Sequence, residues 1–123
     1  MIGRPGLREA LLPAIAIGAS GKIAVLYMGS TNSPGAPWTG SYADTTFTGY
    51  LGLVARPLDR SPLVWAGPVT RAAEPFAYRT CGPGRCNDRV LDFIDVAIAP
   101  DGAVWGAFVD STAGGELVLG RMR

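Results

Sequence analysis

The sequence predicts an all-β fold made of antiparallel four-stranded meanders. Of its 123 residues, 48% are hydrophobic and 17% are charged, a balance that excludes intrinsic disorder. The 17 Gly and 10 Pro residues favour short strands and tight turns over long helices. Short runs rich in Val, Ile, Leu and aromatic residues recur between these turn residues, as expected for strands. A chain of this length can bury a real core, so we expect one β-rich domain.

Seven strands are expected, and they fall into two units. Their ranges are 13–18, 22–29, 49–56, 63–69, 94–99, 103–110 and 116–122. Residues 1–12 form an N-terminal extension, in which Gly6–Leu12 is compatible with a short helical turn. Residues 13–70 form a first blade-like unit, residues 71–92 a Cys-containing loop, and residues 93–123 a second, incomplete unit.

An internal repeat relates the two units. Aligned without a gap, the matched positions are Ile15, Ile17, Gly21, Ile23, Tyr27, Ser30 and Thr31 in the first unit and Val96, Ile98, Gly102, Val104, Phe108, Ser111 and Thr112 in the second. Each unit contains a hairpin with Gly in its tight turn, "GASGK" and then "APDGA", where Gly supplies a positive φ. Repetition of short-strand units is typical of a β-propeller or another repeat array. Two unrelated hairpins within a sandwich are the alternative.

The connections of the first unit alternate between short and long. The turns at 19–21 and 57–62 are short, whereas the connections at 30–48 and 70–92 are long. Alternate connections of an antiparallel meander lie at the same edge, so both long connections are expected at one end, here named the long-loop end. Propellers that bind ligands carry their function on such loops.

Several predicted strands are apolar almost without interruption, which indicates that both of their faces are covered. "IAVLYM" and "FIDVAIA" are examples, and Trp65 and Trp105 lie within predicted strands, where we expect them in the core. The chain supplies about one and three-quarter blades, whereas a propeller needs at least about four to close. We therefore expect a partial β-propeller, completed by the remaining blades of a longer propeller or by a self-associated copy.

The second unit resembles the C-terminal blades of bacterial sialidase-like (BNR-type) six-bladed propellers. The resemblance is carried by "CGPGRC" and "RVLDFIDVAIAPDGAVWGAFVDS", and "IAIGASGKIAVLYMGST" looks like the preceding blade. It implies a propeller architecture and either glycan binding or hydrolysis of the exo-sialidase type. The sialidase Asp-box, Ser-x-Asp-x-Gly-x-Thr-Trp, is absent, and the family's catalytic residues match no local motif here. The catalytic residues of such an activity therefore stay unassigned.

Cys81 and Cys86 flank "GPGR", a short loop in which a disulfide forms easily. A disulfide that closes so small a ring adds roughly 2 kcal/mol to the free energy of unfolding in the chain-entropy model. Such a bond requires an oxidising compartment, so we expect an extracellular or periplasmic parent protein. Two reduced thiols are the alternative. Two Cys without any His cannot complete a structural zinc site, and no metal or cofactor is expected.

Arginines and aspartates around the Cys-containing loop are candidate ligand-binding residues. Arg79 and Arg89 could bind a substrate carboxylate through two hydrogen bonds each, unless they pair with neighbouring acids on a solvated loop. Asp92 and Asp95 would point to opposite faces of a regular strand, so only a bulge or turn between them permits a catalytic pair. Asp95 is expected instead to be buried or channel-facing and to accept backbone hydrogen bonds.

Trp38 and Tyr42 lie in the long connection "TNSPGAPWTGSYADTTFTGY", among Ser, Thr and Gly. Aromatic faces with hydroxyl groups around them would suit sugar rings. Alternatively, these aromatic residues pin a long loop onto the rim of its blade.

Bulk properties exclude some classes of partner. The net charge of +1 gives no reason to expect nucleic acid binding. No apolar run reaches the roughly 18 residues that a membrane span needs, and the start shows no signal peptide. We expect part of an extracellular sialidase-like propeller that binds or hydrolyses glycans or another small polar ligand. A non-catalytic propeller module for protein or glycan binding is the first alternative, and a self-contained β-sandwich is the second.

Overall fold

The structure is a computed structural model that describes residues 5–18, 21–33, 45–70, 76–77, 79–82, 85–88, 90–110 and 116–122. Side chains are described for residues 5–18, 21–33, 45–70, 94–109 and 121. The strands are β1 (Glu9–Ile17), β2 (Ile23–Ser30), β3 (Thr46–Ala55), β4 (Leu63–Pro68), β5 (Phe76–Ala77), β6 (Arg79–Gly82), β7 (Arg85–Asp88), β8 (Val90–Ile98), β9 (Val104–Asp110) and β10 (Glu116–Met122).

The all-β class is confirmed, since the described residues contain strands and turns but no helix. The seven expected strands correspond to β1–β4 and β8–β10, with shifted ends. The segment Gly6–Leu12 forms no helical turn, because β1 already begins at Glu9. The short strands β5, β6 and β7 were not predicted, and they lie within the loop expected over 71–92.

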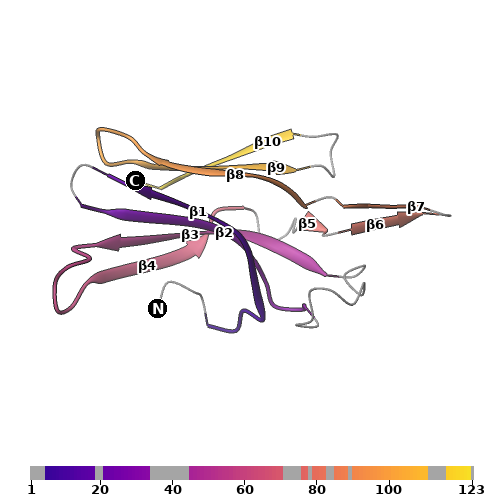
Figure 1. The fold of residues 1–123 in the computed structure, drawn as a ribbon, viewed down its shortest axis with the longest axis horizontal. Coiled ribbons are helices and arrows are strands. Elements are labelled where there is room, and N and C mark those ends of the chain that lie inside the picture. The colour runs from indigo at the N-terminus through magenta and orange to yellow at the C-terminus, as the bar shows by residue number, and fades with distance from the viewer. Residues whose placement is uncertain are drawn as a thin grey trace.

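Two antiparallel meanders make up most of the molecule (Figure 1). The first sheet has the strand order β1-β2-β3-β4, and β5 pairs with the start of β3. The second sheet has the order β10-β9-β8, and β6 and β7 form a separate hairpin. None of these described sheets closes on itself, so the propeller expectation remains a proposal.

Both long connections of the first unit lie at the same end, as predicted. The antiparallel order places the connections after β2 and after β4 at one end, and the short turns after β1, β3 and β8 at the other (Figure 1). Gly21 and Gly102 occupy two of the short turns with φ of 71° and 81°, the left-handed region expected for these glycines.

The two sheets pack face to face through one shared core. Its buried members are Ala24, Leu26, Met28, Phe47 and Leu51 from the first sheet and Val96, Val104 and Phe108 from the second. Two glycines let side chains of the opposite sheet reach the backbone: a Cβ at Gly49 would lie 2.5 Å from Cζ of Phe108, and one at Gly106 would lie 2.7 Å from Cδ1 of Leu26. The sheets also meet at their first strands, where β8 lies against β1 and β2.

Equivalent residues of the two repeat units differ in whether they face this core. In β8 and β9, Val96 and Val104 face the first sheet as part of the core. Their counterparts in β1 and β2, Ile15 and Ile23, belong to the other face of the first sheet. The register shows this, because Ile15 pairs with Val25 and Ile17 pairs with Ile23, whereas the core-facing Ala16 pairs with Ala24. The second sheet therefore packs on the first through the face that carries Val96 and Val104, whereas the equivalent face of the first sheet points away from the second sheet.

The expectation that the strands are covered on both faces is wrong for β1, and the two tryptophans are not in the core. Ile15 is 67% exposed and Ile17 is 73% exposed, while Trp65 and Trp105 are 47% and 39% exposed. The physical reason is that each sheet covers one face of the other. Trp65 is on the core-facing side, since it pairs with Leu53, but it lies on the outermost strand β4.

Thr70 fixes the end of β4 against β3 with a side-chain hydrogen bond. Its Oγ1 accepts a hydrogen bond from the buried N–H of Gly49 at 2.9 Å, and the N–H of Val69 donates to the Gly49 carbonyl. Thr70→Val keeps the shape but leaves this N–H unpaired, and should cost about 1–3 kcal/mol of unfolding free energy. Thr70→Ser keeps the acceptor and should cost less than half as much in urea denaturation. Equal losses for the two variants would contradict this role.

Candidate functional site at the long-loop end

Asp95 is the one predicted ligand-binding residue whose side chain the structure describes. It lies on β8, and its Oδ1 accepts a hydrogen bond from the N–H of Val96 at 2.8 Å. The expected backbone hydrogen bond is confirmed. The side chain is exposed rather than buried, because β8 is an edge strand and the face that carries Asp95 has no covering sheet.

The β8 backbone has the irregularity that an acidic pair would need. Its pairing with β9 shifts register between Val90 and Ile94, which indicates a bulge or a similar irregularity. Such a shift can bring residues three apart, here Asp92 and Asp95, to one face of a strand. The side chain of Asp92 lies outside the described residues, so its convergence with Asp95 stays a prediction.

Most of the other predicted site residues lie outside the described part of the chain. Arg79 is the first residue of β6, but its side chain is not described. Arg89, Trp38 and Tyr42 are outside the described residues altogether. The structure therefore brings none of these side chains together and separates none of them.

The two cysteines lie opposite each other in the β6–β7 hairpin. The register pairs Cys81 with Cys86. Directly opposed residues of antiparallel strands have Cα atoms about 4.5–5.5 Å apart, which is within the range that disulfides bridge. The sulfur atoms lie outside the described residues, so the disulfide stays a prediction with a backbone that permits it.

The disulfide has a direct test. The intact mass of the protein, measured without reductant, should be lower by two hydrogen atoms than the mass after reduction. Replacing both cysteines with serine should remove this difference and lower the unfolding free energy by roughly 2 kcal/mol. Free thiols that react with an alkylating agent in the folded protein would contradict the disulfide.

A polar cluster that sequence analysis missed fixes the base of the long β2–β3 connection. Oγ of Ser30 accepts hydrogen bonds from the N–H groups of Asn32 at 3.3 Å and of Ser33 at 3.1 Å. The Ser30 hydroxyl donates to Oδ1 of Asn32, which also accepts from the N–H of Thr46 at 3.1 Å. The hydroxyl of Ser33, which is fully buried, donates to the carboxylate of Glu9.

This cluster, formed by Glu9, Ser30, Asn32, Ser33 and Thr46, ties both ends of the connection to the first sheet. Asn32 lies at the start of the connection and Thr46 directly follows it, so their hydrogen bond closes the loop at its base. The loop that contains the aromatic candidates therefore leaves the sheet from a fixed position. The Ser and Asn residues of "GSTNS" were the available signal, because such side chains commonly bond to nearby backbone groups.

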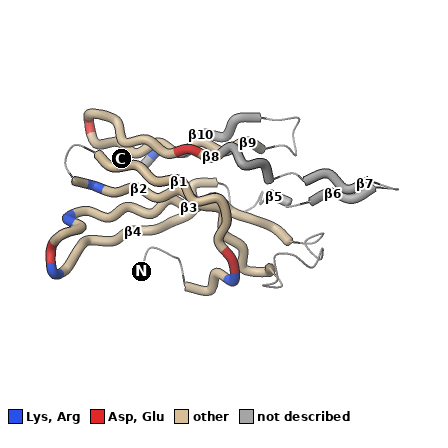
Figure 2. The backbone as a smooth tube through the Cα atoms, viewed as in Figure 1, with Lys and Arg blue, Asp and Glu red and all other residues tan. Residues whose placement is uncertain are grey.

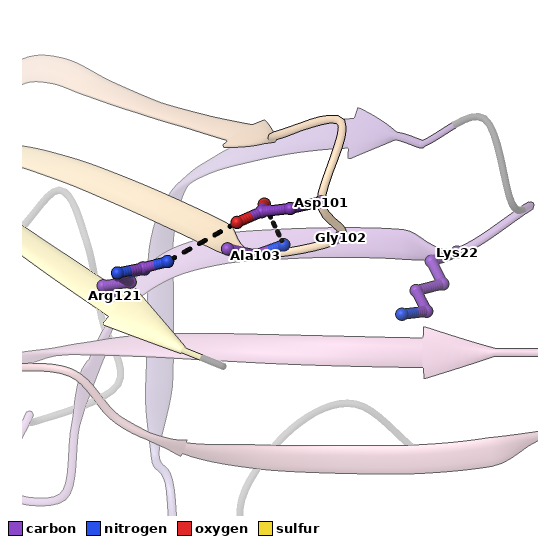
Figure 3. Close-up of a pocket in the computed structure, with 5 residues that line it drawn as sticks. All are labelled: Lys22, Asp101, Gly102, Ala103 and Arg121. Atoms are coloured by element: carbon purple, nitrogen blue, oxygen red, sulfur yellow. Dashed lines mark hydrogen bonds and ion pairs between the residues drawn. The ribbon is translucent and has the colours of Figure 1, made fainter.

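The short-turn end holds an open hollow of about 430 Å³, lined by Lys22, Asp101, Gly102, Ala103 and Arg121 (Figure 3). Arg121 Nη2 lies 3.6 Å from Asp101 Oδ2, and Asp101 Oδ1 accepts a hydrogen bond from the N–H of Ala103 at 3.0 Å. Arg121 also lies over the ring of Trp105, 4.8 Å from its centroid. These contacts stabilise the Pro-Asp-Gly turn and pair Arg121 with Asp101.

The fold and the described polar groups define a two-sheet β-protein whose longest connections gather at one end. Comparisons with protein-family models, with curated proteins and with solved structures found no match for the chain. In the part of the chain that the structure describes, no three His, Cys, Asp or Glu residues are grouped to hold a metal ion. The described residues also include no helix that is long and apolar enough to cross a membrane.

Proposed function

We propose that the chain forms two successive blade-like units of a sialidase-like β-propeller and binds glycans at its long-loop end. The observation that carries the architecture is the stacking of the repeat. Val96 and Val104 of the second unit pack on the first sheet, while their counterparts Ile15 and Ile23 belong to that sheet's other face. Successive units related by one rotation pack in this way, as the blades of a propeller do. In a sandwich whose two units are related by a two-fold axis, equivalent residues of both units would instead face the shared core.

The number of strands in the second sheet supports the same architecture. The second sheet has three strands, and among the described residues none of them packs extensively on β4 of the first sheet. Leu63 and Trp65, which pair with Ala55 and Leu53 in β3, are accordingly 61% and 47% exposed. A fourth strand beside β10 would cover them and complete the second unit as a four-stranded blade.

The ligand assignment is supported by the chemistry of the long-loop end. The fixed base of the β2–β3 connection presents a segment with aromatic and hydroxyl residues, which suits sugar rings. The Cys-containing segment supplies Arg79 and Arg89, which suit a carboxylate on the sugar. In this proposal the chain recognises an acidic glycan, and a hydrolytic activity would draw its catalytic acid and nucleophile mainly from other blades.

Titration calorimetry with sialyllactose and with lactose tests this proposal. We expect measurable binding of sialyllactose and weaker binding of lactose, because only the former carries a carboxylate. Replacing Arg79 or Arg89 with alanine should weaken sialyllactose binding at least about tenfold. Arg60→Ala is the matched control, since Arg60 is exposed at the short-turn end and should leave affinity unchanged.

The same samples separate the alternatives. Release of the fluorophore from a fluorogenic sialoside would assign turnover to this chain in addition to binding. Equal affinity for the two sugars, or an equal effect of Arg60→Ala, would contradict the acidic-glycan assignment. Absence of any sugar binding would favour a module that binds protein.

A further inference from the structure

The outer face of the first sheet is apolar and only partly covered. It carries Ile15, Ile17, Ile23, Val25 and Val64, here named the open face of the first sheet. Ile15, Ile17 and Val64 are 67%, 73% and 41% exposed. Of all the residues in β1–β4, Glu9 alone is charged, and the other charged residues described between positions 5 and 70 lie in turns and in the N-terminal segment (Figure 2). A patch of this kind marks an interaction surface.

The internal repeat indicates what kind of surface covers this face. The counterparts of Ile15, Ile17 and Ile23 are Val96, Ile98 and Val104, and these residues pack on the core-facing side of β1 and β2. That side consists of small and aliphatic residues, Ala14, Ala16, Ala24 and Leu26. We therefore expect the open face of the first sheet to pack against a sheet face that resembles the core-facing side of β1 and β2.

The same chain exposes a counterpart of that surface. The repeat aligns Ala14, Ala16, Ala24 and Leu26 with Asp95, Ala97, Trp105 and Ala107, which lie on the outer side of β8 and β9, here named the open face of the second sheet. Ala97 is exposed and Trp105 is 39% exposed. Each chain thus carries one face of each kind, and in the described part of the chain no other sheet packs on either of them.

We propose that the chain associates head to tail with further copies of itself, the open face of the first sheet of one copy packing on the open face of the second sheet of the next. This contact repeats the packing between the two units within one chain. Unlike surfaces meet, so the contact is heterologous and its repetition gives a ring or an open array. Asp95, the counterpart of Ala14, lies on this same face of the edge strand β8, and its side chain is exposed. The proposal concerns the partner only and does not depend on which ligand the long-loop end takes.

Sedimentation of the full chain and of two variants tests the proposal. Ile17→Glu places a charge on the open face of the first sheet, and Trp105→Glu places one on the open face of the second, where Arg121 can pair with it. The wild-type chain should sediment as oligomers whose mass rises with concentration, while each variant alone should be a monomer. An equimolar mixture of the two variants should give dimers and nothing larger, because each variant keeps one intact face. Leu58→Glu is the control, since Leu58 is 98% exposed in the β3–β4 turn and should sediment as wild type does.

Several outcomes would overturn the proposal. A monomeric wild-type chain would show that the open faces do not join copies, and would assign them to other sheets of a longer polypeptide. Dimers of Trp105→Glu alone would show that like faces meet. A mixture that stays monomeric while the wild type associates would show that other surfaces join the copies. Sugar binding is measured separately, so none of these outcomes decides the glycan proposal.

Discussion

Alanine in place of Phe108 should lower the free energy of unfolding by about 3–5 kcal/mol. Phe108 is 3% exposed and is the largest described side chain that the second sheet contributes to the core. Its ring fits over the bare backbone of Gly49 in the opposite sheet, so its removal leaves a cavity between the sheets. Urea denaturation followed by tryptophan fluorescence measures the loss.

Leu58→Ala is the control for this experiment. Leu58 is 98% exposed, and its replacement should change stability by no more than about 0.5 kcal/mol. A loss at Phe108 as small as the loss at Leu58 would show that the two sheets do not share a core.

Alanine in place of Gly49 should cost about 1–3 kcal/mol, because the new methyl group overpacks the same contact. The added Cβ would lie 2.5 Å from Cζ of Phe108 and 2.9 Å from Cγ2 of Thr70. Shortening the opposing side chain with Phe108→Leu should relieve part of this cost. The double variant should therefore be more stable than the sum of the two single changes predicts, with a coupling of about 0.5–3 kcal/mol.

Gly21→Ala is the matched control, since no heavy atom lies within 4 Å of its added Cβ. Its cost arises from the positive φ alone, about 1–2 kcal/mol, and should be the same in the wild-type chain and in the Phe108→Leu variant. Additive effects of the Gly49 and Phe108 changes would contradict the contact between them.

The class of fold and the seven principal strands could be predicted from the sequence because apolar runs and turn residues alternate clearly. The start of β1 could not. The predicted strand begins at Pro13, a residue that cannot donate to a ladder, whereas β1 begins at Glu9. The structure instead passes through Pro13 with a register shift between Leu11 and Ala14, and Leu12 adopts a φ of 52°. The short strands β5–β7 lacked a signal, because their segments are short and rich in turn residues.

Which face of each strand packs could not be predicted from the repeat alone. Ile15 and Val96 occupy equivalent positions, yet Ile15 is 67% exposed and Val96 is 6% exposed. Sequence similarity identifies equivalent positions, whereas burial depends on whether a neighbouring sheet lies against that face. Trp65 and Trp105 were expected in the core because they lie within predicted strands, and both are partly exposed.

Few of the described contacts near the long-loop end could be predicted from the sequence, and the candidate site itself stays a prediction. The backbone hydrogen bond of Asp95 was predicted, because an acidic residue within an apolar strand needs a donor. The cluster around Asn32, whose members come from both sides of a long connection, was missed. Also missed was the hollow at Lys22 and Asp101, which exists because the turns of the two units come together when the units stack.

A disulfide engineered between the two units tests the stacking of the repeat most directly. In a Cys81→Ser, Cys86→Ser background, Gly18→Cys is combined with Ile98→Cys. A Cβ at Gly18 would lie 3.4 Å from Cβ of Ile98, close to the ~3.5–4.5 Å seen in disulfides. The control pair is Ile17→Cys with Ile98→Cys, because Ile17 belongs to the open face of the first sheet. After mild oxidation, mass spectrometry should show an intramolecular disulfide in the 18/98 pair and free thiols in the 17/98 pair. A disulfide in the 17/98 pair with free thiols in the 18/98 pair would show that the opposite face of β1 packs on β8, and would contradict the head-to-tail stacking of the two units.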